Sequence, residues 1–417
     1  MEPIRIGIIG TGGFAAEHHA ALQALEAAGE FRLIATCDPN PSLIAAAAER
    51  WNLEERGVRR YADYRAMLEA EAGALEVVTV PTPIPLHAEM HRACVERHLA
   101  CYLEKPPTLD YVELDTMLAV EADARRATQV GFNFIVEAPR QALKARIIAG
   151  EFGAVRRVGF TGLWPRPTTY YQRNNWAGRL RQGDRMVLDS CIGNAMAHYI
   201  HNVHFWAGQE GLFSWATAAR VEAELYRARA IEGFDTCFVR AVCDNGIALH
   251  IAASHACDGA SGQQEWVECE QATITYITHK HYSIAWRDGR TEAGPADLRP
   301  LLQENFRAYG AYLRGDAPRP LTRLIDSRPF VELNDLVYVA AGTITDAGKS
   351  GAAERRQVPE SGAELFVLPD IRKVVTAFAA SGQFPSAQGV SWGRPGGSGA
   401  ARADLGRLRE TVYSLSP

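Results

Sequence analysis

The segment Gly10-Thr11-Gly12-Gly13-Phe14-Ala15 has the pattern G-x-G-x-x-A and follows the apolar run Ile4–Ile9. In such a turn, Gly10 permits a tight bend, Gly12 lets the backbone approach a pyrophosphate, and the small Ala15 lets a helix pack closely on the strand. Free N–H groups at the start of the following helix attract the pyrophosphate anion. Taken alone, the same pattern would also fit a purely structural turn.

Asp38 is a second candidate residue and ends the next apolar run, in the sequence LIATCDPN. It follows the glycine-rich segment at close to the roughly 20-residue spacing expected of an acid that binds ribose hydroxyls. A carboxylate there accepts hydrogen bonds from the 2′- and 3′-hydroxyls and repels a 2′-phosphate. No Arg or Lys directly follows Asp38 to bind such a phosphate. The two motifs together predict NAD, in preference to NADP, as the cofactor.

Glu104-Lys105-Pro106 comes directly after the apolar run Leu99–Leu103. Charged residues at the carboxyl end of a strand in an open parallel sheet point into the crevice where ligands bind. A lysine there can donate a hydrogen bond to a substrate hydroxyl or carbonyl and stabilise developing negative charge on its oxygen. On its own, the tripeptide would equally fit a surface loop with a salt bridge.

The elements that must position these residues are short apolar runs alternating with helical patterns. Strand-like runs occur at Ile4–Ile9, Arg32–Cys37, Leu75–Val80, Leu99–Leu103 and Thr128–Phe134. This alternation, with short links, implies a parallel sheet covered by helices on both faces. We therefore expect an α/β protein whose residues 1–128 form a Rossmann domain with a doubly wound parallel sheet.

After Phe134 the apolar runs become longer, and several alternate apolar with polar residues, as a mostly antiparallel sheet requires. These runs are Val155–Leu163, Ser214–Tyr226, Phe234–Cys243, Gly246–Ser254, Trp266–Thr278 and His281–Trp286. Helical patterns occur at 139–150, 298–314 and 327–347. We expect residues 129–347 to form an α+β domain on a large open sheet, for substrate binding and oligomerisation. Residues 348–417, rich in Gly, Ser and Pro, are expected to be an extension packed on the domains.

Composition excludes several classes of protein. With 44 basic and 49 acidic residues the formal charge is −5, and no dense basic block is present, which argues against a nucleic-acid partner. No apolar run approaches the length of a membrane span, and the N-terminus lacks the basic region and cleavage site of a signal peptide. The eight cysteines form no CxxC pair and are expected to be reduced and buried. These features favour the cytoplasm.

Four segments resemble the glucose-fructose oxidoreductase/inositol dehydrogenase/rhizopine catabolism (Gfo/Idh/MocA) family. They are GIIGTGGFAAEHHAAL, VVTVPTPIPLHAEM, YLEKPPT and VLDSCIGNAMAHYIHN, which occur in the family's order and spacing across residues 4–345. The resemblance implies that Thr82, Pro83 and His87 border the nicotinamide, and that Lys105 lies near the hydroxyl being oxidised. The residues expected to bind the cofactor are Gly10, Thr11, Gly12, Gly13, Phe14, Ala15, Asp38, Thr82, Pro83, His87, Glu104 and Lys105.

The family also carries D-x-x-x-H in its second domain, where the Asp and His bind substrate and the His acts as acid/base. Asp189 has the expected local setting, but the residue four positions later is Gly193. The spacing is instead reproduced by Asn194 and His198. We prefer this second register and keep Asp189 as a pocket residue. The expected catalytic residues are therefore Lys105, His198, Asp189 and Asn194, the last three also binding substrate.

The segment LWPRPTTYYQRNNWAGRL, residues 163–180, mixes aromatic rings with Arg and Asn side chains. Rings can stack on the C–H faces of a sugar, and planar polar groups can hydrogen-bond its hydroxyls. The same composition suits a packed loop or a protein interface. Because the segment precedes Asp189, we expect Trp164, Arg173 and Asn174 to contact the substrate.

The resulting hypothesis is a reversible NAD-dependent transfer of hydride from a secondary alcohol of a sugar, cyclitol or related polyol. Two alternatives are a glycosidase that oxidises its sugar transiently with bound NAD, and a non-catalytic NAD-binding sensor. His198, His201 and His204 recur every three residues, but no carboxylate or cysteine completes a metal-ligand set, so we expect no metal. β-Branched residues on both faces of Ala272–Thr278, together with the resemblance, predict a homo-oligomer, dimer or tetramer.

Overall fold

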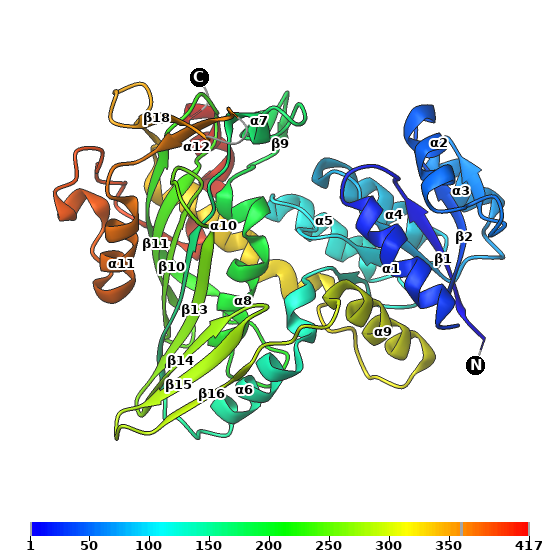
Figure 1. The fold of residues 1–417 in the computed structure, drawn as a ribbon, viewed down its shortest axis with the longest axis horizontal. Coiled ribbons are helices and arrows are strands. Elements are labelled where there is room, and N and C mark those ends of the chain that lie inside the picture. Colours follow the sequence, from blue (N-terminus) through cyan, green and yellow to red (C-terminus); the bar gives the residue numbers. More distant parts are fainter. Residues whose placement is uncertain (1, 359–361, 416–417) are drawn as a thin grey trace. The chain divides into compact units, whose positions relative to one another are not determined.

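The computed structural model describes residues 2–358 and 362–415. The chain divides into two compact units (Figure 1). Unit 1 comprises Met1–Thr108, Val112–Val136 and Leu298–Ser327, and unit 2 comprises Leu109–Tyr111, Glu137–Asp297 and Arg328–Pro417. Within the described residues, no helix has both the length and the apolar character needed to cross a bilayer.

Unit 1 contains a parallel six-stranded sheet in the order β3-β2-β1-β4-β5-β6. Its strands are β1 (Ile4–Ile9), β2 (Phe31–Cys37), β3 (Arg59–Tyr61), β4 (Val77–Val80), β5 (Ala100–Leu103) and β6 (Gln129–Val130). Its helices are α1 (Ala15–Ala27), α2 (Pro41–Arg50), α3 (Tyr64–Ala70), α4 (His87–Glu96), α5 (Tyr111–Glu121, whose first residue falls in unit 2) and α9 (Leu301–Arg314). The strand order reverses direction between β1 and β4, so the predicted doubly wound Rossmann sheet is confirmed.

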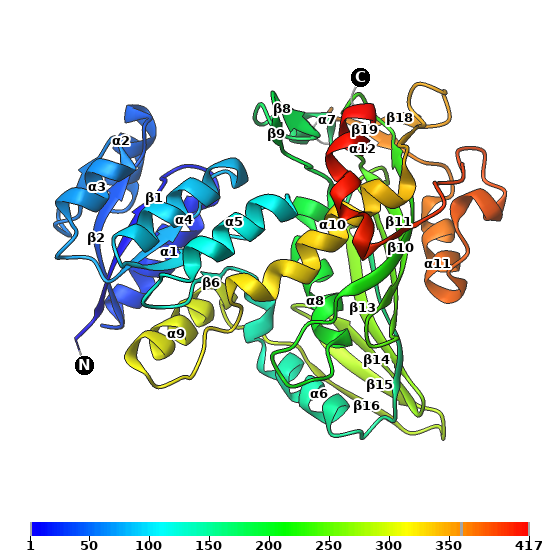
Figure 2. The ribbon, with the colours of Figure 1, turned by 180° about the vertical axis from the view of Figure 1, so that it is seen from behind.

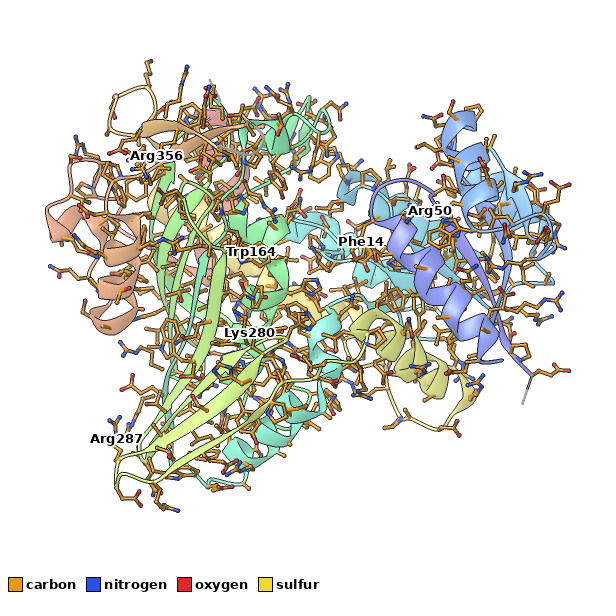
Figure 3. All side chains as sticks on the ribbon, in the orientation of Figure 1. Phe14, Arg50, Trp164, Lys280, Arg287 and Arg356 are labelled. Carbon is orange, nitrogen blue, oxygen red and sulfur yellow. The ribbon has the colours of Figure 1, made fainter. Side chains whose placement is uncertain are left out.

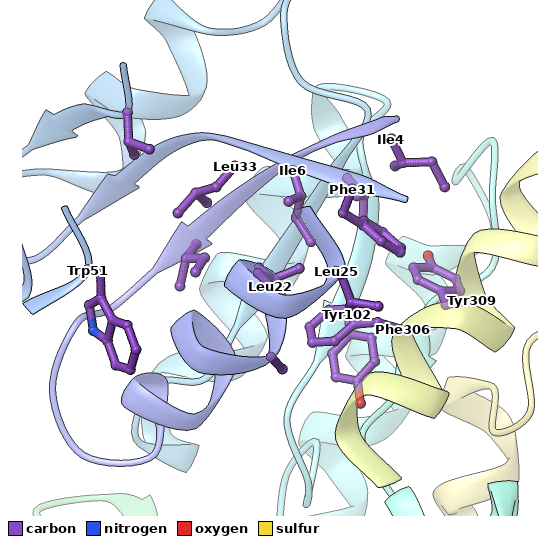
Figure 4. Close-up of a cluster of buried hydrophobic side chains, with 14 of the residues drawn as sticks. Ile4, Ile6, Leu22, Leu25, Phe31, Leu33, Trp51, Tyr102, Phe306 and Tyr309 are labelled. Carbon is purple, nitrogen blue, oxygen red and sulfur yellow. The ribbon is translucent and has the colours of Figure 1, made fainter. Parts of the chain in front are cut away.

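The core of unit 1 joins segments that are far apart in the sequence (Figure 4). Phe306 on α9 stacks on Tyr102 of β5 with ring centroids 4.5 Å apart, and packs edge-on against Phe31 of β2. Gly310 lets α9 approach closely, because a Cβ there would lie 3.2 Å from side-chain atoms of Ile4 and Phe31. The helix predicted near residues 298–314 therefore exists, and it completes the Rossmann core.

Unit 2 contains a ten-stranded, mostly antiparallel sheet in the order β16-β15-β14-β13-β7-β12-β11-β10-β17, with β20 also paired to β10. Its strands are β7 (Val155–Leu163), β10 (Ala218–Arg227), β11 (Thr236–Cys243), β12 (Ala248–Ser254), β13 (Gly262–Cys269), β14 (Ala272–Ile277), β15 (His281–Trp286), β16 (Thr291–Pro295), β17 (Thr345–Asp346) and β20 (Ala400–Ala401). Two small ribbons pair β8 (Arg181–Gln182) with β9 (Arg185–Met186) and β18 (Glu354–Gln357) with β19 (Glu364–Val367). The helices are α6 (Ala138–Ile148), α7 (Thr168–Tyr171), α8 (Ala197–Ala207), α10 (Arg328–Ala341), α11 (Ile371–Ser381) and α12 (Leu408–Leu415). This sheet confirms the predicted α+β class.

The large sheet of unit 2 carries apolar side chains on both of its faces. Phe160 of β7 stacks on Tyr199 of α8 with ring centroids 4.8 Å apart. On the opposite face, Ala252 of β12 belongs to a buried cluster with Phe378 of α11 and with Trp392. The two turned views agree that α11 lies on one side of the strands and α8 on the other (Figures 1 and 2). Because successive side chains of a strand point to opposite faces, both faces need a cover.

The second cover comes from the C-terminal residues, which we expected only to pack on a domain surface. Within unit 2, α11 contacts β7 and β12, and Trp392 packs edge-on against Tyr226 of β10. Both Phe378 and Trp392 are almost fully buried. Residues of the same chain therefore cover this face of the sheet at β7, β12 and β10. The homo-oligomer expected from the residues of Ala272–Thr278 stays a prediction.

One predicted strand is much shorter than expected. The run Thr128–Phe134 forms only the two-residue β6, followed by a 3-10 helix at Asn133–Val136. The chain bends at Gly131, whose backbone lies so close to Glu104 that an added Cβ would be 2.7 Å from Glu104 Oε1. The Phe132 amide donates back to the Val130 carbonyl at 2.8 Å, so the chain turns at Gly131 instead of continuing as a strand.

Candidate active site

The glycine-rich turn joins β1 to α1, as the sequence predicts. Gly10 has φ 109° and Gly13 has φ 57°, both in the left-handed region that favours glycine. The Gly10 amide donates to the carbonyl of Cys37 at 2.8 Å, which fixes the turn against β2. Phe14 at the start of α1 is about half exposed (Figure 3). The glycines of the turn therefore present backbone at the amino end of α1, with the Phe14 ring beside them.

Asp38 holds this turn in place. Its Oδ2 accepts hydrogen bonds from the Thr11 amide at 3.0 Å and the Thr11 hydroxyl at 2.9 Å, and its Oδ1 accepts from the Asn40 amide at 2.9 Å. A carboxylate offers about four lone-pair sites, so one acceptor position remains at Oδ1 for a further donor such as a ribose hydroxyl. The structure thus brings the two predicted cofactor motifs together, and the residues present fit a dinucleotide.

Glu104 is buried, and both of its carboxylate oxygens have donors within unit 1. Oε1 lies 3.0 Å from Nε2 of His18, and Oε2 accepts from the Lys105 amide at 3.0 Å. His18 Nδ1 lies 2.9 Å from the Thr79 hydroxyl, and His18 is fully buried on α1. These contacts make Glu104 a brace for the Lys105 backbone, and its expected contact with the cofactor stays a prediction. Lys105 itself is only half-buried.

His18, the partner of Glu104, is not among the site residues that the sequence predicts. It lies on α1 and is fully buried. Its ring packs edge-on against Tyr102 and Phe306, with centroids 5.8 and 5.5 Å away. Its partner Glu104 directly follows β5 and is 86 residues further along the chain, so no local sequence pattern indicates the contact.

His87 is also buried, and it joins two turns at the carboxyl edge of the sheet. Its Nδ1 lies 2.9 Å from the Pro106 carbonyl and its Nε2 lies 2.8 Å from the Thr82 carbonyl. Burial lowers the pKa of His87, although the two carbonyls oppose this. His87 therefore connects the Thr82-Pro83 turn to Pro106 through backbone groups, and its ring nitrogens are already engaged. The Thr82 methyl would lie 3.5 Å from a Cβ built on Gly10, which places that turn beside the glycine-rich turn.

In unit 2 the structure brings together the first residues of the two candidate registers, Asp189 and Asn194. Asp189 Oδ1 accepts a hydrogen bond from Asn194 Nδ2 at 3.0 Å, and Oδ2 accepts from the Gly178 amide at 2.6 Å. Ser190 caps the turn at Cys191–Ala195 by accepting from the Gly193 amide at 2.9 Å. His198 follows in the first turn of α8 and is half-buried. Asp189 thus holds Asn194 directly.

Gly193 explains why the first register contains no histidine. A Cβ at this position would lie 2.9 Å from Asn334 Oδ1, 3.0 Å from Ser190 Oγ and 3.2 Å from the Leu188 carbonyl. A side chain cannot enter without displacing the cap and Asn334. The packing therefore favours the register of Asn194 and His198, in which the histidine begins a regular helix.

The three residues of the aromatic segment that were expected to contact substrate have different surroundings in the structure. Trp164 donates from Nε1 to Gln263 Oε1 at 3.0 Å (its place on the ribbon is labelled in Figure 3). Asn174 Oδ1 accepts from the amides of Trp176 at 3.1 Å and Ala177 at 2.7 Å, so this oxygen holds a turn. Arg173 is exposed and stacks on Tyr170, with Cζ 3.9 Å from the ring centroid. Asn174 is thus a turn former, while Arg173 remains accessible.

The other histidines of α8 are packing residues. His201 lies against the Trp215 ring at 5.1 Å, and His204 Nδ1 lies 2.7 Å from the Ala216 carbonyl. Burial lowers the pKa of His204 to about 4, so this ring is neutral near pH 7. Among the residues that the structure describes, no three His, Cys, Asp or Glu side chains gather as a metal site would require.

Two family models match the chain along most of its two units. The model described as "Oxidoreductase family, NAD-binding Rossmann fold" matches residues 4–132, and the "GFO/IDH/MocA C-terminal domain" model matches residues 140–275. The chain belongs to the Gfo/Idh/MocA oxidoreductase family. The family predicted from four short motifs is therefore confirmed, and so is NAD as the cofactor.

Individual relatives share less than a third of their aligned residues with this chain. Inositol 2-dehydrogenase from Rhizobium meliloti is 27% identical over 173 residues, which are 41% of this chain and 49% of that protein, so the chain spans about half the length of this Gfo/Idh/MocA relative. An oxidoreductase from Agrobacterium radiobacter in complex with NAD+, L-tartaric acid and magnesium has a TM-score of 0.66 at 18% identity, over 81% of this chain and 96% of that one. An inositol dehydrogenase homolog from Azotobacter vinelandii, complexed with NADH and myo-inositol, has a TM-score of 0.65 at 18% identity, over 80% and 94%. At these identities the two solved structures show the shared fold.

The contacts of Asp38 generate a prediction about cofactor choice. Replacing Asp38 with Ala removes both the acceptor for ribose hydroxyls and the charge that repels a 2′-phosphate. We expect the ratio of kcat/KM for NAD over NADP to fall by about tenfold or more, because a juxtaposed like charge costs several kcal/mol. Steady-state kinetics with both cofactors measure the ratio. Asp63→Ala, which removes the acid that caps α3, is the matched control and should leave the ratio unchanged. Equal efficiency with NADP in the unmodified protein would contradict the assignment.

Proposed function

We propose that this chain is an NAD-dependent dehydrogenase that transfers hydride between the cofactor and a secondary alcohol of a sugar, cyclitol or related polyol. The observation that carries the proposal is the pair of carboxylate contacts at the carboxyl edge of the unit 1 sheet: Asp38 holds Thr11 of the glycine-rich turn, and the buried Glu104 holds the backbone amide of Lys105. Inositol 2-dehydrogenase and levoglucosan dehydrogenase are among the curated relatives, which supports a polyhydroxylated substrate.

NAD, when bound, supplies the hydride acceptor, and the chain supplies binding and proton transfer. The amides of the glycine-rich turn bind the pyrophosphate, and the remaining acceptor site of Asp38 takes a ribose hydroxyl. The Lys105 ammonium stabilises negative charge that develops on the substrate oxygen, an electrostatic contribution that is strong in a desolvated site. Glu104 positions Lys105 by holding its amide and remains bound to His18.

Proton removal from the substrate hydroxyl is assigned to His198 or Lys105. The half-buried His198 occupies the first turn of α8, directly after the capped turn that contains Asn194. Asp189 holds the Asn194 amide group, so the oxygen of that amide is oriented rather than free to flip. Asn194 in place of an acid cannot raise the basicity of an imidazole as a carboxylate would, which increases the share of proton transfer that falls to Lys105.

The activity is tested with a screen of sugars, inositols and sugar acids, each with NAD and with NADP. We expect at least one polyol to give a net increase in the absorbance of reduced nicotinamide, larger with NAD. Cleavage of a glycoside without net NADH would favour the glycosidase alternative. Tight NAD binding with no turnover of any compound would favour the sensor.

The proton-transfer residues are tested by substitution. We expect Lys105→Ala and His198→Ala each to lower kcat by roughly a hundredfold or more, the usual scale for lost acid–base help. The affinity for NAD should stay near that of the unmodified protein, and His204→Ala, on the same helix, should retain far more activity than His198→Ala. If His198→Ala were fully active and Asp189→Asn inactive, the register of Asn194 and His198 would be wrong.

We also propose that the protein is a homo-oligomer, a dimer or tetramer, and that it acts in the cytoplasm. All eight cysteines are buried free thiols, which fits a reducing compartment.

Along β14 the buried residues alternate with half-exposed Thr273, Thr275 and Ile277, a face well suited to pairing with a second copy. Sedimentation equilibrium should show a dimer or larger species, with or without reductant, and Thr275→Arg should weaken it. A single species of monomer mass would refute the oligomer.

A further inference from the structure

We propose that the segment from Trp164 to Trp176 in unit 2 binds an anionic group of the substrate, a carboxylate or a phosphate, through Arg166 and Arg173. This inference rests on the proposed function and narrows its substrate class from polyols in general to acidic sugars or sugar phosphates. It depends on how the two guanidinium groups are held, on which charges surround them, and on their connection to Asp189.

Both guanidinium groups are held by aromatic rings of the same segment. Arg173 Cζ lies 3.9 Å from the centroid of Tyr170 and 5.4 Å from that of Trp176. Arg166 Cζ lies 4.9 Å from the centroid of Tyr170 and 5.5 Å from that of Trp164. A ring that covers the face of a guanidinium group orders it and leaves the N–H groups at its edge available to a planar acceptor.

Neither guanidinium group, of Arg166 or of Arg173, has a carboxylate ion-pair partner in the described part of the chain. Their neighbour Arg229, in contrast, pairs with Asp235 at 3.0 Å and donates to the Arg166 carbonyl at 2.7 Å. The two positive charges beside the Tyr170 ring repel each other. An anion bound between them would be attracted by both and would offset this repulsion.

Two further nitrogen atoms near the pair, Nε of Arg166 and Nε2 of His255, are buried without a hydrogen-bond partner within the described part of the chain. For Arg166 this arrangement costs stability unless a ligand supplies the acceptor. His255 packs edge-on against the Tyr170 ring, with ring centroids 5.6 Å apart. It is 1% exposed, and its Nδ1 lies 2.8 Å from the Tyr171 hydroxyl. Burial, together with the nearby Arg229, Arg166 and Arg173, holds the pKa of His255 well below its usual value, so this histidine stays neutral.

The arginine pair is directly linked to the candidate substrate residues. Asp189 accepts from the Gly178 amide, and its own amide donates to the Arg179 carbonyl at 3.0 Å, so the loop after Arg173 is tied to Asp189. An acid bound by Arg166 and Arg173 would therefore lie beside the residues proposed to contact the substrate hydroxyls.

The test compares ligands that differ only in the anion. D-Glucuronate, D-glucose 6-phosphate and D-glucose are titrated by calorimetry into the full-length protein saturated with NADH, and kcat/KM with NAD is measured for each. We expect one of the two anions to bind at least tenfold more tightly than glucose, and the tighter of the two identifies the group as a carboxylate or a phosphate.

The variants are Arg166→Gln, Arg173→Gln and Arg240→Gln. Arg240 is a matched control, because it also stacks on an aromatic ring, Phe384 at 4.7 Å, but is paired with Glu222. The first two substitutions should each remove most of the preference for the anion while leaving the affinity for NADH unchanged, and the control should keep the preference. Arg173→Lys should retain part of it, because the charge remains without the forked donors.

Several results would overturn the inference. They are anions that bind no better than glucose, no measurable binding of any of the three ligands, or arginine variants that weaken glucose and the anions equally. If the anion preference and its loss in the variants are observed but no compound yields NADH, the proposed dehydrogenase activity fails while the anion site stands.

Discussion

The Asp38 carboxylate, shared between the amide and hydroxyl of Thr11, is the interaction on which the arrangement of unit 1 depends. It fixes the turn that leads into α1, and α1 in turn carries His18 to the buried side of the sheet. His18 bridges Thr79 and Glu104, and Glu104 holds the amide of Lys105. Two sets of polar contacts, joined by helix α1, therefore connect the acid expected to meet the ribose with the lysine expected to meet the substrate. Because the members are buried, loss of any one would leave its partners unsatisfied.

Unit 2 uses a comparable arrangement around Asp189. This carboxylate connects the aromatic segment, through the Gly178 amide, with the turn before α8, through Asn194. The far end of α8 is fixed as well, since the buried Lys144 ammonium donates to the carbonyls of Phe205 and Gly208. Cations are favoured at the carboxyl end of a helix, where carbonyls lack partners. The helix that carries His198 is thus held at both ends.

What the sequence predicts well is local. The glycine-rich turn, Asp38 and the tripeptide Glu104-Lys105-Pro106 are contiguous patterns with one physical purpose each, and the structure places them along one edge of a parallel sheet. The role of Glu104 could not be predicted, because its partner His18 is 86 residues away and is indistinguishable in sequence from a surface histidine of α1. Asn174 likewise looked like a sugar contact, but its oxygen is used by backbone amides two and three residues later.

Packing between distant segments accounts for the other differences. Nothing in the sequence near Phe306 indicates that its ring belongs beside Tyr102, and nothing near Phe378 or Trp392 shows that they cover the sheet of unit 2. Gly193 illustrates the opposite case: it seemed to break a family pattern, and the structure gives a steric reason. The four-residue spacing from Asn194 to His198 was enough to predict the register that the packing around Gly193 favours.

The most direct measurement of the central claim follows the hydrogen itself. The full-length protein is incubated with NAD and a panel of sugars, sugar acids and cyclitols deuterated at their ring carbons, and the recovered cofactor is analysed by mass spectrometry and NMR. The account predicts NADH with deuterium at C4 of the nicotinamide from at least one of these substrates, and no labelled NADH from the Lys105→Ala protein on the same timescale. Product formed without deuterium ever reaching the cofactor would contradict it.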